Sequence, residues 1–328
     1  MNECILFIIN FFFTLQAATS NSMDGEFSLL FAAPNFPGVP QSNLHVRLSE
    51  DYNRKSLPSN EINIDRIWEL RRKSNPRLYN GSKFRFHAIE VDSNGGDCSS
   101  CSAGVTFHLG ITGYKNFMGT NWADNATELL ESGVKDFANS QAYMSDALGV
   151  GSLVHTADEC VVLIRRSSSV GEAQGLWDIP GGHPEPGEVK GGSSKMEDIT
   201  LSDISELDVS KELVDSAMRE IRDEINIPKS KLEEPHLMGV TRNHTSSGRP
   251  NMQFFVRCTL PSSEVRQMYR AGGAEAEEST ALKLIQLSDI FYLESTDMWK
   301  EMAPAAKACV KLYTTLRNNL SDSENNIT

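Results

Sequence analysis

Three carboxylates stand close together in the segment R-E-I-R-D-E-I-N-I, residues 219–227. Glu220, Asp223 and Glu224 are spaced i, i+3 and i+4, so on an α-helix they line one edge of its surface. Apolar residues cover the adjoining face. Like charges at this spacing repel one another, and a hard divalent cation such as Mg²⁺ would relieve the repulsion. The pattern therefore indicates either a metal site or the solvated face of an ordinary helix.

A loop rich in glycine and proline precedes this helix, with the sequence G-L-W-D-I-P-G-G-H-P-E-P-G-E over residues 175–188. Gly181 and Gly182 permit an unusual backbone path, and Glu185 and Glu188 add two carboxylates near the helix. A glycine loop that feeds an acidic helix favours the metal site over the solvated face.

Gly182, Glu188 and the acidic helix together resemble the Nudix box, G-x5-E-x7-R-E-U-x-E-E-x-G-U, where U is aliphatic. The chain departs from the box in three ways: residues 189–218 replace the seven-residue spacer, Asp223 replaces a Glu, and Asn226 replaces a Gly. A loop about four times longer costs only ~1.2 kcal/mol in closure entropy. Asn is the usual second choice where a helix ends in a left-handed turn, so we expect such an end at Asn226.

Other stretches resemble one branch of this family, the animal uridine diphosphate glucose pyrophosphatases, over about residues 23–317. They are residues 110–122, 141–151, 180–186 and 272–280. The resemblance implies hydrolysis of UDP-glucose and UDP-galactose to UMP and a hexose 1-phosphate, with Mg²⁺, or alternatively Mn²⁺, as the cofactor. It implies the metal ligands Glu220 and Glu224. Asp223 is one methylene shorter than Glu, so we expect it to bind the metal through water.

The resemblance also implies a set of substrate contacts. Matching of local motifs places them at Tyr79, Tyr114, Arg166, Gly171, Asp178, His183, Glu185 and Ser279. Glu220, Glu224 and Glu185 are all candidates for the catalytic residue that takes a proton from water, since the sequence fixes no distances.

Several of these residues also have an ordinary structural interpretation. Tyr114 could stack on uracil or cap a core, and Arg166 could grip a phosphate or stay solvated at a strand end. Asp178 could bind a sugar hydroxyl or brace its loop. Trp122 and Trp177 are expected to pack rather than to contact ligand.

The order of elements predicts an α/β fold: a Nudix-type α/β/α sandwich with a mixed sheet, preceded by a smaller α+β N-terminal domain. We expect an extension at 1–22, a substrate-binding domain at 23–150, a Nudix domain at 151–317 and a disordered tail at 318–328. Helices are predicted at 61–73, 122–132, 210–226, 262–271 and 296–317. Strands are predicted near 84–92, 104–111, 236–242, 252–259 and 281–287, with a further apolar strand within 154–167.

Composition limits the functional classes. The chain has 328 residues, of which 39% are hydrophobic and 23% charged, an ordinary globular balance that excludes a multispan membrane protein. Its formal net charge of −13 repels nucleic acid, so a phosphate-bearing substrate needs local cations. The partner we expect is therefore a small-molecule UDP-sugar, with no nucleic acid and no membrane; the oligomeric state is left open.

Cysteines and the N-terminal residues bear on the compartment. The six cysteines give no disulfide framework, and Cys98-x-x-Cys101 is interpreted as part of a hairpin loop rather than half a zinc site. The apolar run within residues 1–20 is too short to span a bilayer and carries Glu3 without Lys or Arg. We expect a cytoplasmic protein, with Met23 as a second candidate start. Secretion is the alternative, because the chain has five N-x-S/T sequons.

Two other functions fit the same residues. A hydrolase of this family could instead act on ADP-ribose, a dinucleoside polyphosphate or a coenzyme A derivative. Alternatively, the interrupted box could belong to a module that binds a UDP-sugar without cleaving it.

Overall fold

The computed structural model describes residues 25–92, 104–191 and 195–325, with side chains described up to residue 320. The predicted extension at 1–22, together with Cys98 and Cys101, lies outside the described residues. None of the described helices is long and apolar enough to cross a bilayer.

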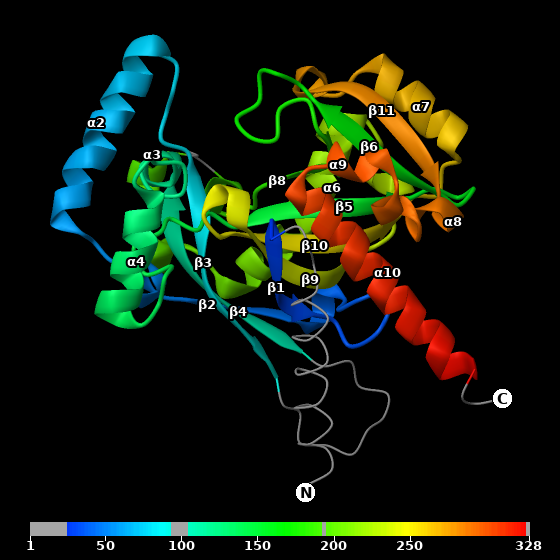
Figure 1. The fold of residues 1–328 in the computed structure, drawn as a ribbon, viewed down its shortest axis with the longest axis horizontal. Helices are drawn as coiled ribbons and strands as arrows, with labels where there is room; N and C mark the ends of the chain where they lie inside the picture. The colour runs from blue at the N-terminus through cyan, green and yellow to red at the C-terminus, as the bar shows by residue number, and fades with distance from the viewer. Residues whose placement is uncertain (1–24, 93–103, 192–194, 326–328) are drawn as a thin grey trace, which may run out of the picture.

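A large mixed sheet forms the centre of the molecule (Figure 1). Its strand order is β1-β9-β10-β5-β6-β11, with the short β7 beside β6 and β8 beside β5. The β10–β5 pair is parallel and the other named pairs are antiparallel. The strands are β1 (Phe27–Ala32), β5 (Gly149–His155), β6 (Cys160–Arg166), β7 (Trp177–Asp178), β8 (Gly181–Gly182), β9 (His236–Asn243), β10 (Arg249–Arg257) and β11 (Ser279–Gln286).

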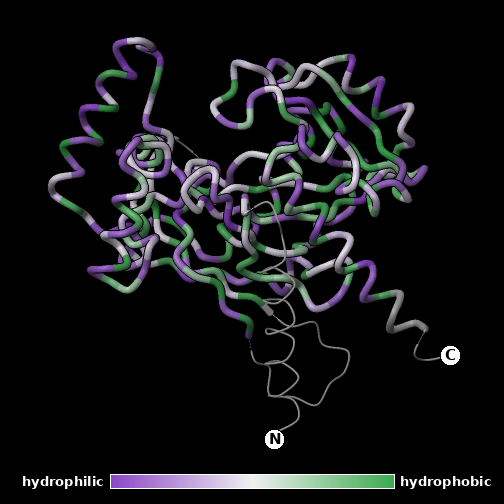
Figure 2. Tube along the Cα trace, in the orientation of Figure 1, coloured by the Kyte–Doolittle hydropathy of each residue, from purple (hydrophilic) through white to green (hydrophobic). Residues whose placement is uncertain are grey.

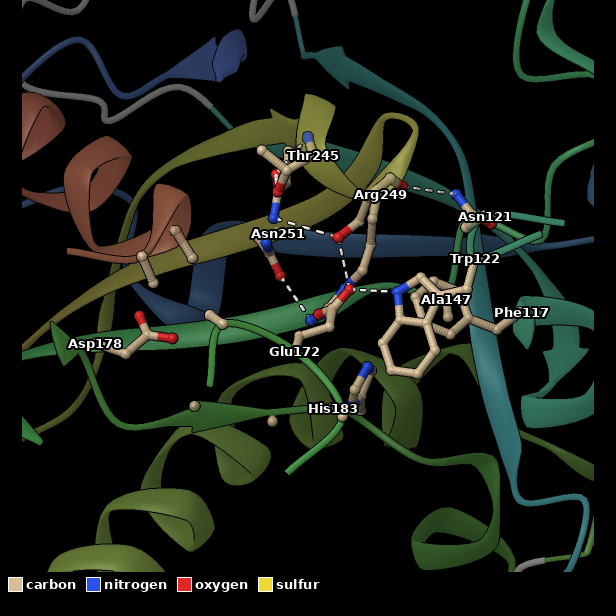
Figure 3. A pocket seen from close by; sticks show the side chains of 18 of the residues that line it. Phe117, Asn121, Trp122, Ala147, Glu172, Asp178, His183, Thr245, Arg249 and Asn251 are labelled. Carbon is tan, nitrogen blue, oxygen red and sulfur yellow. Dashed lines mark hydrogen bonds and ion pairs between the residues drawn. The ribbon is translucent and has the colours of Figure 1, made fainter. Parts of the chain in front are cut away.

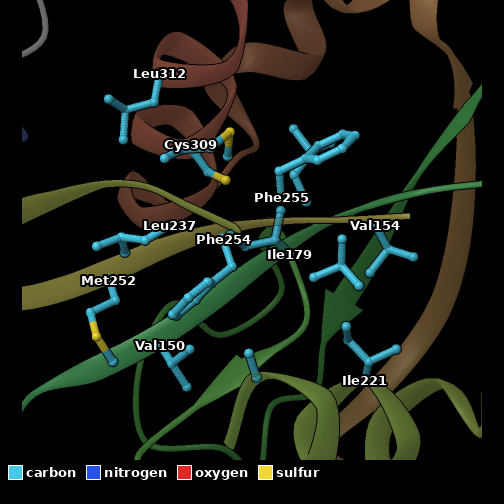
Figure 4. Packing of buried hydrophobic residues seen from close by; sticks show 14 of the residues in the cluster. Val150, Val154, Ile179, Ile221, Leu237, Met252, Phe254, Phe255, Cys309 and Leu312 are labelled. Carbon is cyan, nitrogen blue, oxygen red and sulfur yellow. The ribbon is translucent and has the colours of Figure 1, made fainter. Parts of the chain in front are cut away.

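Helices cover both faces of this sheet. Figure 4 shows Cys309 and Leu312 of α10 (Pro304–Asn325) on one face and Ile221 of α6 (Glu206–Ile225) on the other. All three side chains belong to one buried apolar cluster with the strand residues between them. The arrangement confirms the predicted α/β/α sandwich with a mixed sheet.

A second, three-stranded sheet lies beside the first, in the order β2-β4-β3. Its strands are β2 (Leu44–Leu48), β3 (Ser82–Val91) and β4 (Val105–Gly113), accompanied by α2 (Pro58–Ser74), α3 (Tyr114–Met118) and α4 (Ala126–Phe137). α2 lies at the edge of the molecule and is largely hydrophilic, whereas hydrophobic residues gather in the strands (Figure 2). Strand β1 comes from the same part of the sequence but belongs to the large sheet, so residues 23–150 contribute to both sheets.

Most elements lie where the sequence predicts them, with ends within four residues for α2, α6, α7 (Ser262–Ala271), β3, β4, β9, β10 and β11. The apolar strand predicted within 154–167 is confirmed as β6, which ends in the paired arginines, but a start at Val154 is wrong: residues 156–159 form a turn between β5 and β6, and Glu159 has a φ of 62°. The prediction of one helix at 296–317 is also wrong. It is split into α9 (Asp297–Lys300) and α10, because Ala303 donates its N–H to the carbonyl of Trp177 (2.8 Å) and Pro304 follows.

Helix α6 carries the three carboxylates and ends as predicted. Asn226 caps it in the left-handed conformation, with φ 67° and ψ 26°, which confirms the role expected for the residue that replaces the glycine of the box. At its other end α6 packs on the small sheet: Glu206 accepts from Arg47 (2.9 Å) and Ser210 donates to the carbonyl of Leu44. The residues inserted into the box thus reach from α6 to the small sheet.

Candidate active site

A cavity of about 1140 Å³ is lined by residues of the large sheet and of the small-sheet region. Six of the predicted substrate contacts line it: Tyr79, Tyr114, Arg166, Gly171, Asp178 and His183. The described residues that line it do not include Glu185, Ser279, Glu220 or Glu224. The fold therefore brings most of the predicted contacts to one cavity and leaves the helix carboxylates just outside its wall.

The glycine loop forms the wall between the cavity and α6. Gly181 donates its N–H to Oε2 of Glu224 (2.9 Å), and the N–H of His183 donates to Glu220. Gly182 lines the cavity and abuts the carboxylate of Glu220 so closely that a Cβ at this position would clash with it. Glycine is thus needed at 182 because the carboxylate occupies the place of a side chain.

Glu220 and Glu224 form a pair of neighbouring carboxyl groups, of which Glu224 is buried and Glu220 partly buried. Burial and the neighbouring Glu220 raise the pKa of Glu224 well above its usual value. Burial and then Glu275 raise the pKa of Glu220 to about 8. Among the described residues neither carboxylate forms an ion pair. Two neighbouring carboxyl groups that are held in a low-dielectric site without an ion pair are an arrangement that a bound cation would stabilise.

Asp223, the third predicted ligand, is engaged elsewhere. Both of its oxygens accept from Arg222, from Nε at 2.7 Å and from the terminal nitrogen at 2.7 Å. Within the described chain, no three His, Cys, Asp or Glu side chains are arranged to hold a metal ion. A metal role for Asp223 stays a prediction.

An ion-pair network fixes the start of the acidic segment. Arg219 pairs with Glu212 (2.6 Å) and lies 3.8 Å from Glu188, the carboxylate of the box that precedes the insertion. Glu212 also accepts the backbone N–H of Glu185 (3.0 Å), whose own side chain pairs with Lys83 of β3. Glu185 is therefore anchored to α6 and to the small sheet, close to the cavity that Lys83 lines.

Cations gather on the cavity side of the glycine loop. The pKa of His183 lies well below its usual value because of burial and then the nearby positive charges of Arg249, Lys83 and Arg166. The histidine is therefore neutral at pH 7, and the three cations supply locally the positive charge that the acidic chain lacks overall. Such a group of cations suits phosphate oxygens.

Arg166 and Asp178 lie together at the end of β6 and in β7. The guanidinium of Arg166 is 3.6 Å from Oδ2 of Asp178 and donates from Nε to the carbonyl of Glu172 (2.9 Å). Burial raises the pKa of Asp178. Ser279 of β11 lies opposite Arg166 of β6 in the antiparallel register. Its hydroxyl, however, is buried and hydrogen-bonded to that of Tyr269 (2.9 Å). A substrate contact by Ser279 stays a prediction.

Glu172 joins three separate segments at the cavity wall (Figure 3). It accepts from the indole N–H of Trp122 (2.7 Å) and the hydroxyl of Ser246 (2.6 Å), and it pairs with Arg249. Burial alone would raise the pKa of Glu172, but these partners hold it below the usual value. Trp122 packs so closely over Gly171 that a Cβ there would clash with the ring. The predicted packing role of Trp122 is thus combined with a place in the cavity lining.

Two tyrosines of the small-sheet region mark the aromatic end of the cavity. Tyr114 lies edge-on to Trp122, with ring centroids 6.3 Å apart, and burial raises its pKa. Tyr79 is 54% exposed, which leaves a ring face accessible at the opening. An exposed ring and a half-buried ring in one cavity lining suit stacking of a planar base.

Sequence reasoning did not single out several residues that shape the site: Lys83, Glu172, Glu212, Arg249, Glu275 and Glu278. Two of them had a local signal, because Glu275 and Glu278 lie in the stretch 272–280 that resembles the family. Both contribute to the raised pKa of a helix carboxylate, Glu275 at Glu220 and Glu278 at Glu224. The other four reach the site through contacts between distant segments, and no local sequence motif marks them.

Comparison with known proteins gives close relatives. No protein-family model matches the chain. Over 291 residues it is 40% identical to uridine diphosphate glucose pyrophosphatase NUDT22 of Mus musculus, covering 89% of this chain and 91% of the mouse protein. The Homo sapiens protein of the same name is 40% identical over 298 residues, covering 90% and 95%. Nudix hydrolase 9 of Arabidopsis thaliana is 30% identical over 282 residues, covering 85% and 89%.

A search of solved structures finds the MutT protein from Methanosarcina mazei Go1. It is 17% identical, with a TM-score of 0.33, and the alignment covers 52% of this chain and 94% of that protein.

Proposed function

The chain belongs to the Nudix hydrolase family, and from this premise we propose that it is a Mg²⁺-dependent pyrophosphatase of UDP-glucose and UDP-galactose. Water attacks one phosphorus of the diphosphate, the bridging P–O bond breaks, and UMP and a hexose 1-phosphate leave. Relatives that carry the name of a UDP-glucose pyrophosphatase match about nine tenths of the chain and support this substrate class.

One observation carries the proposal: the glycine loop separates a pair of acids from a group of cations. On one side its N–H groups hold Glu224 and Glu220. On the other side the side chain of His183 lies near Arg249, Lys83 and Arg166. A diphosphate in the cavity would thus meet cations directly, and Gly181 and Gly182, which contact the two acids, also line the cavity.

Glu220 and Glu224 are the residues that would hold Mg²⁺. Their buried like charges, without an ion pair among the described residues, fit a divalent cation. Mg²⁺ commonly takes one or two carboxylates and completes its shell with water and substrate phosphates, so a third protein carboxylate is not required. Mn²⁺ prefers the same oxygen ligands. When bound, the metal supplies charge neutralisation at the diphosphate and lowers the pKa of water.

The side chains along the cavity suggest how the substrate is oriented. Tyr79 and Tyr114 would stack the uracil at the aromatic end. Arg166 and Arg249 would donate to phosphate oxygens, where fixed cations in a water-poor site act most strongly. Asp178, on the other side of Asn251 from Trp122 in Figure 3, would face the hexose.

A carboxylate must accept the proton of the attacking water. Glu185 pairs with Lys83, a residue of the cavity lining, and this ion pair fixes the position of the carboxylate beside the cavity. Glu220 and Glu224 are the other candidates, and once a metal occupies their site both are ionised.

The test incubates the protein with UDP-glucose, UDP-galactose, ADP-ribose, a dinucleoside tetraphosphate and coenzyme A, each with Mg²⁺ and with EDTA, and identifies products by mass spectrometry. The proposal expects UMP from the two UDP-hexoses, only with metal. It expects Glu224→Gln to lose at least about 100-fold in kcat. The matched control is Glu233→Gln, which removes the same charge from an exposed position.

Two results would contradict the proposal. Turnover that survives Glu224→Gln would exclude the metal role of this helix. Tight binding of UDP-glucose without UMP release at high Mg²⁺ would instead identify a binding module.

A further inference from the structure

Strand β10 presents a row of polar side chains to the cavity. Arg249, Asn251 and Gln253 occupy alternate positions, so they share one face of the sheet, and all three line the cavity. β10 lies inside the large sheet between β9 and β5. A polar row on an interior strand is unusual, since such positions normally carry apolar residues. Arg249 pairs with Glu172 and is assigned above to the phosphates, which leaves the two amides to be explained.

Glycines of the neighbouring strand make room for these amides. Asn251 lies opposite Gly149 and Gln253 opposite Gly151 in the parallel β10–β5 pair. A Cβ at Gly149 would overlap Oδ1 of Asn251, and one at Gly151 would lie 3.1 Å from Oε1 of Gln253. Each amide therefore lies against bare backbone, and any larger residue on β5 would displace it.

The fold does not use the full hydrogen-bonding capacity of either amide. Gln253 is completely buried; its Nε2 donates to Thr241 (3.3 Å), while its Oε1 has no partner in the described part of the chain. Oδ1 of Asn251 accepts from Arg249 (3.2 Å), and its Nδ2 has no partner among the described residues. Rotating an amide by 180° exchanges the two atoms and still leaves one unpaired. A buried polar atom left unpaired is unfavourable, and a ligand that pairs with it removes that cost.

We infer that Asn251 and Gln253, together with Asp178, form the subsite for the hexose of the substrate. The inference rests on the proposed function and names the residues that select the sugar. A carboxamide both donates and accepts, as does each hydroxyl of a hexose, so neighbouring hydroxyls can pair with both amides.

The position of the amides favours the hexose over the base. The aromatic rings that suit uracil lie at Tyr79 and Tyr114, and Arg249 lies between Trp122 and Asn251 in Figure 3. Figure 3 shows Asn251 between Arg249 and Asp178, on the side away from Trp122 and Phe117. A UDP-hexose whose base stacks at the aromatic end therefore brings its sugar to the amides.

The test separates recognition of the sugar from recognition of the nucleotide. Gln253→Met and Asn251→Leu keep side-chain volume close to the original and remove the polar atoms. For each variant we measure kcat/KM for UDP-glucose and the inhibition constant of UDP, which has the uridine and the diphosphate but no hexose. We expect kcat/KM to fall about tenfold or more per variant, and the UDP constant to stay within about twofold, since an unpaired group in a site built for hydroxyls discriminates strongly.

Controls make the outcomes distinct. Gln286→Met on β11, outside the cavity lining, removes the same amide and should change neither constant. Thermal melts establish that each variant folds. If Asn251→Leu fails to fold, Asn251→Asp, which keeps the shape of the side chain, takes its place. Unchanged kcat/KM, or an equal loss for UDP and UDP-glucose, would overturn the hexose subsite. Absence of UDP-glucose turnover in the wild type would instead refute the proposed function.

Discussion

Replacing Glu220 with Gln should stabilise the metal-free protein. Burial and Glu275 raise the pKa of this carboxyl from 4.5 to about 8 in the folded state. Between these values the folded state binds more protons than the unfolded state, so stability falls as the pH rises from 4.5 to 8. At pH 7 the difference spans 2.5 pH units at about 1.36 kcal/mol each, which gives a cost of about 3 kcal/mol. Gln has no proton to lose and does not incur this cost.

The assay is thermal unfolding in EDTA at pH 7 and pH 4.5. At pH 7 the variant should melt about 5–10 °C above the wild type, and at pH 4.5 the gain should be below about 0.5 kcal/mol. Added Mg²⁺ should raise the midpoint of the wild type but not that of the variant. Glu233→Gln, at an exposed position, should leave the midpoint unchanged at both pH values. A gain that is absent at pH 7, or equal at both pH values, would refute the reasoning.

Three further outcomes follow from named contacts. Asp158 caps the start of α7, and the hydrogen bond from the hydroxyl of Ser262 is the main cause that lowers its pKa to about 2. Asp158→Asn should lower the free energy of unfolding by about 1 kcal/mol at pH 7. The difference between variant and wild type should narrow as the pH falls from about 5 toward about 2. Glu212→Gln breaks the pair with Arg219 and should cost about 3 kcal/mol in urea unfolding; an unchanged midpoint would contradict a stabilising role. Gly182→Ala should displace Glu220 and lower kcat at least about tenfold with an unchanged circular dichroism spectrum, whereas full activity would mean that the loop can shift.

Local sequence patterns predicted the helices and strands well where the apolar residues of a segment follow a single helical or strand periodicity. The amphipathic repeat of α6 and its end at Asn226 both follow from interactions within a few residues, and the structure confirms them. Family membership was predicted from short motifs for the same reason, because each motif is contiguous. The turn between β5 and β6 was missed because three polar residues, Thr156, Asp158 and Glu159, interrupt an otherwise apolar run. The break before Pro304 was missed because the helical spacing of apolar residues continues across it.

Contacts between distant segments could not be predicted in this way. Glu172 pairs with Arg249 across 77 positions of sequence, and Lys83 pairs with Glu185 across 102. Neither Arg249 nor Lys83 stands in a recognisable motif. Glu172 is an ordinary loop glutamate when considered alone, whereas Glu185 lies in the stretch 180–186 that resembles the family. Only the closure of the sheets around one cavity brings them together. The sequence therefore indicated the need for cations at a phosphate site without identifying most of them.

The long insertion in the box illustrates how a departure from the motif can serve the site. Near its start, Met196 donates its N–H to the carbonyl of Asn80 (2.8 Å), and Glu197 accepts from the Asn80 amide (3.0 Å). The same Asn80 side chain accepts the N–H of Lys115 (2.9 Å), so it links the residue after Tyr79 to the residue after Tyr114.

The insertion that ends in α6 thus holds the backbone beside both tyrosines of the aromatic end. A seven-residue spacer, at about 3.5 Å per residue, reaches at most ~25 Å and would join Glu188 to Arg219 without touching this region. The longer path therefore couples the position of the carboxylate helix to that of the aromatic wall.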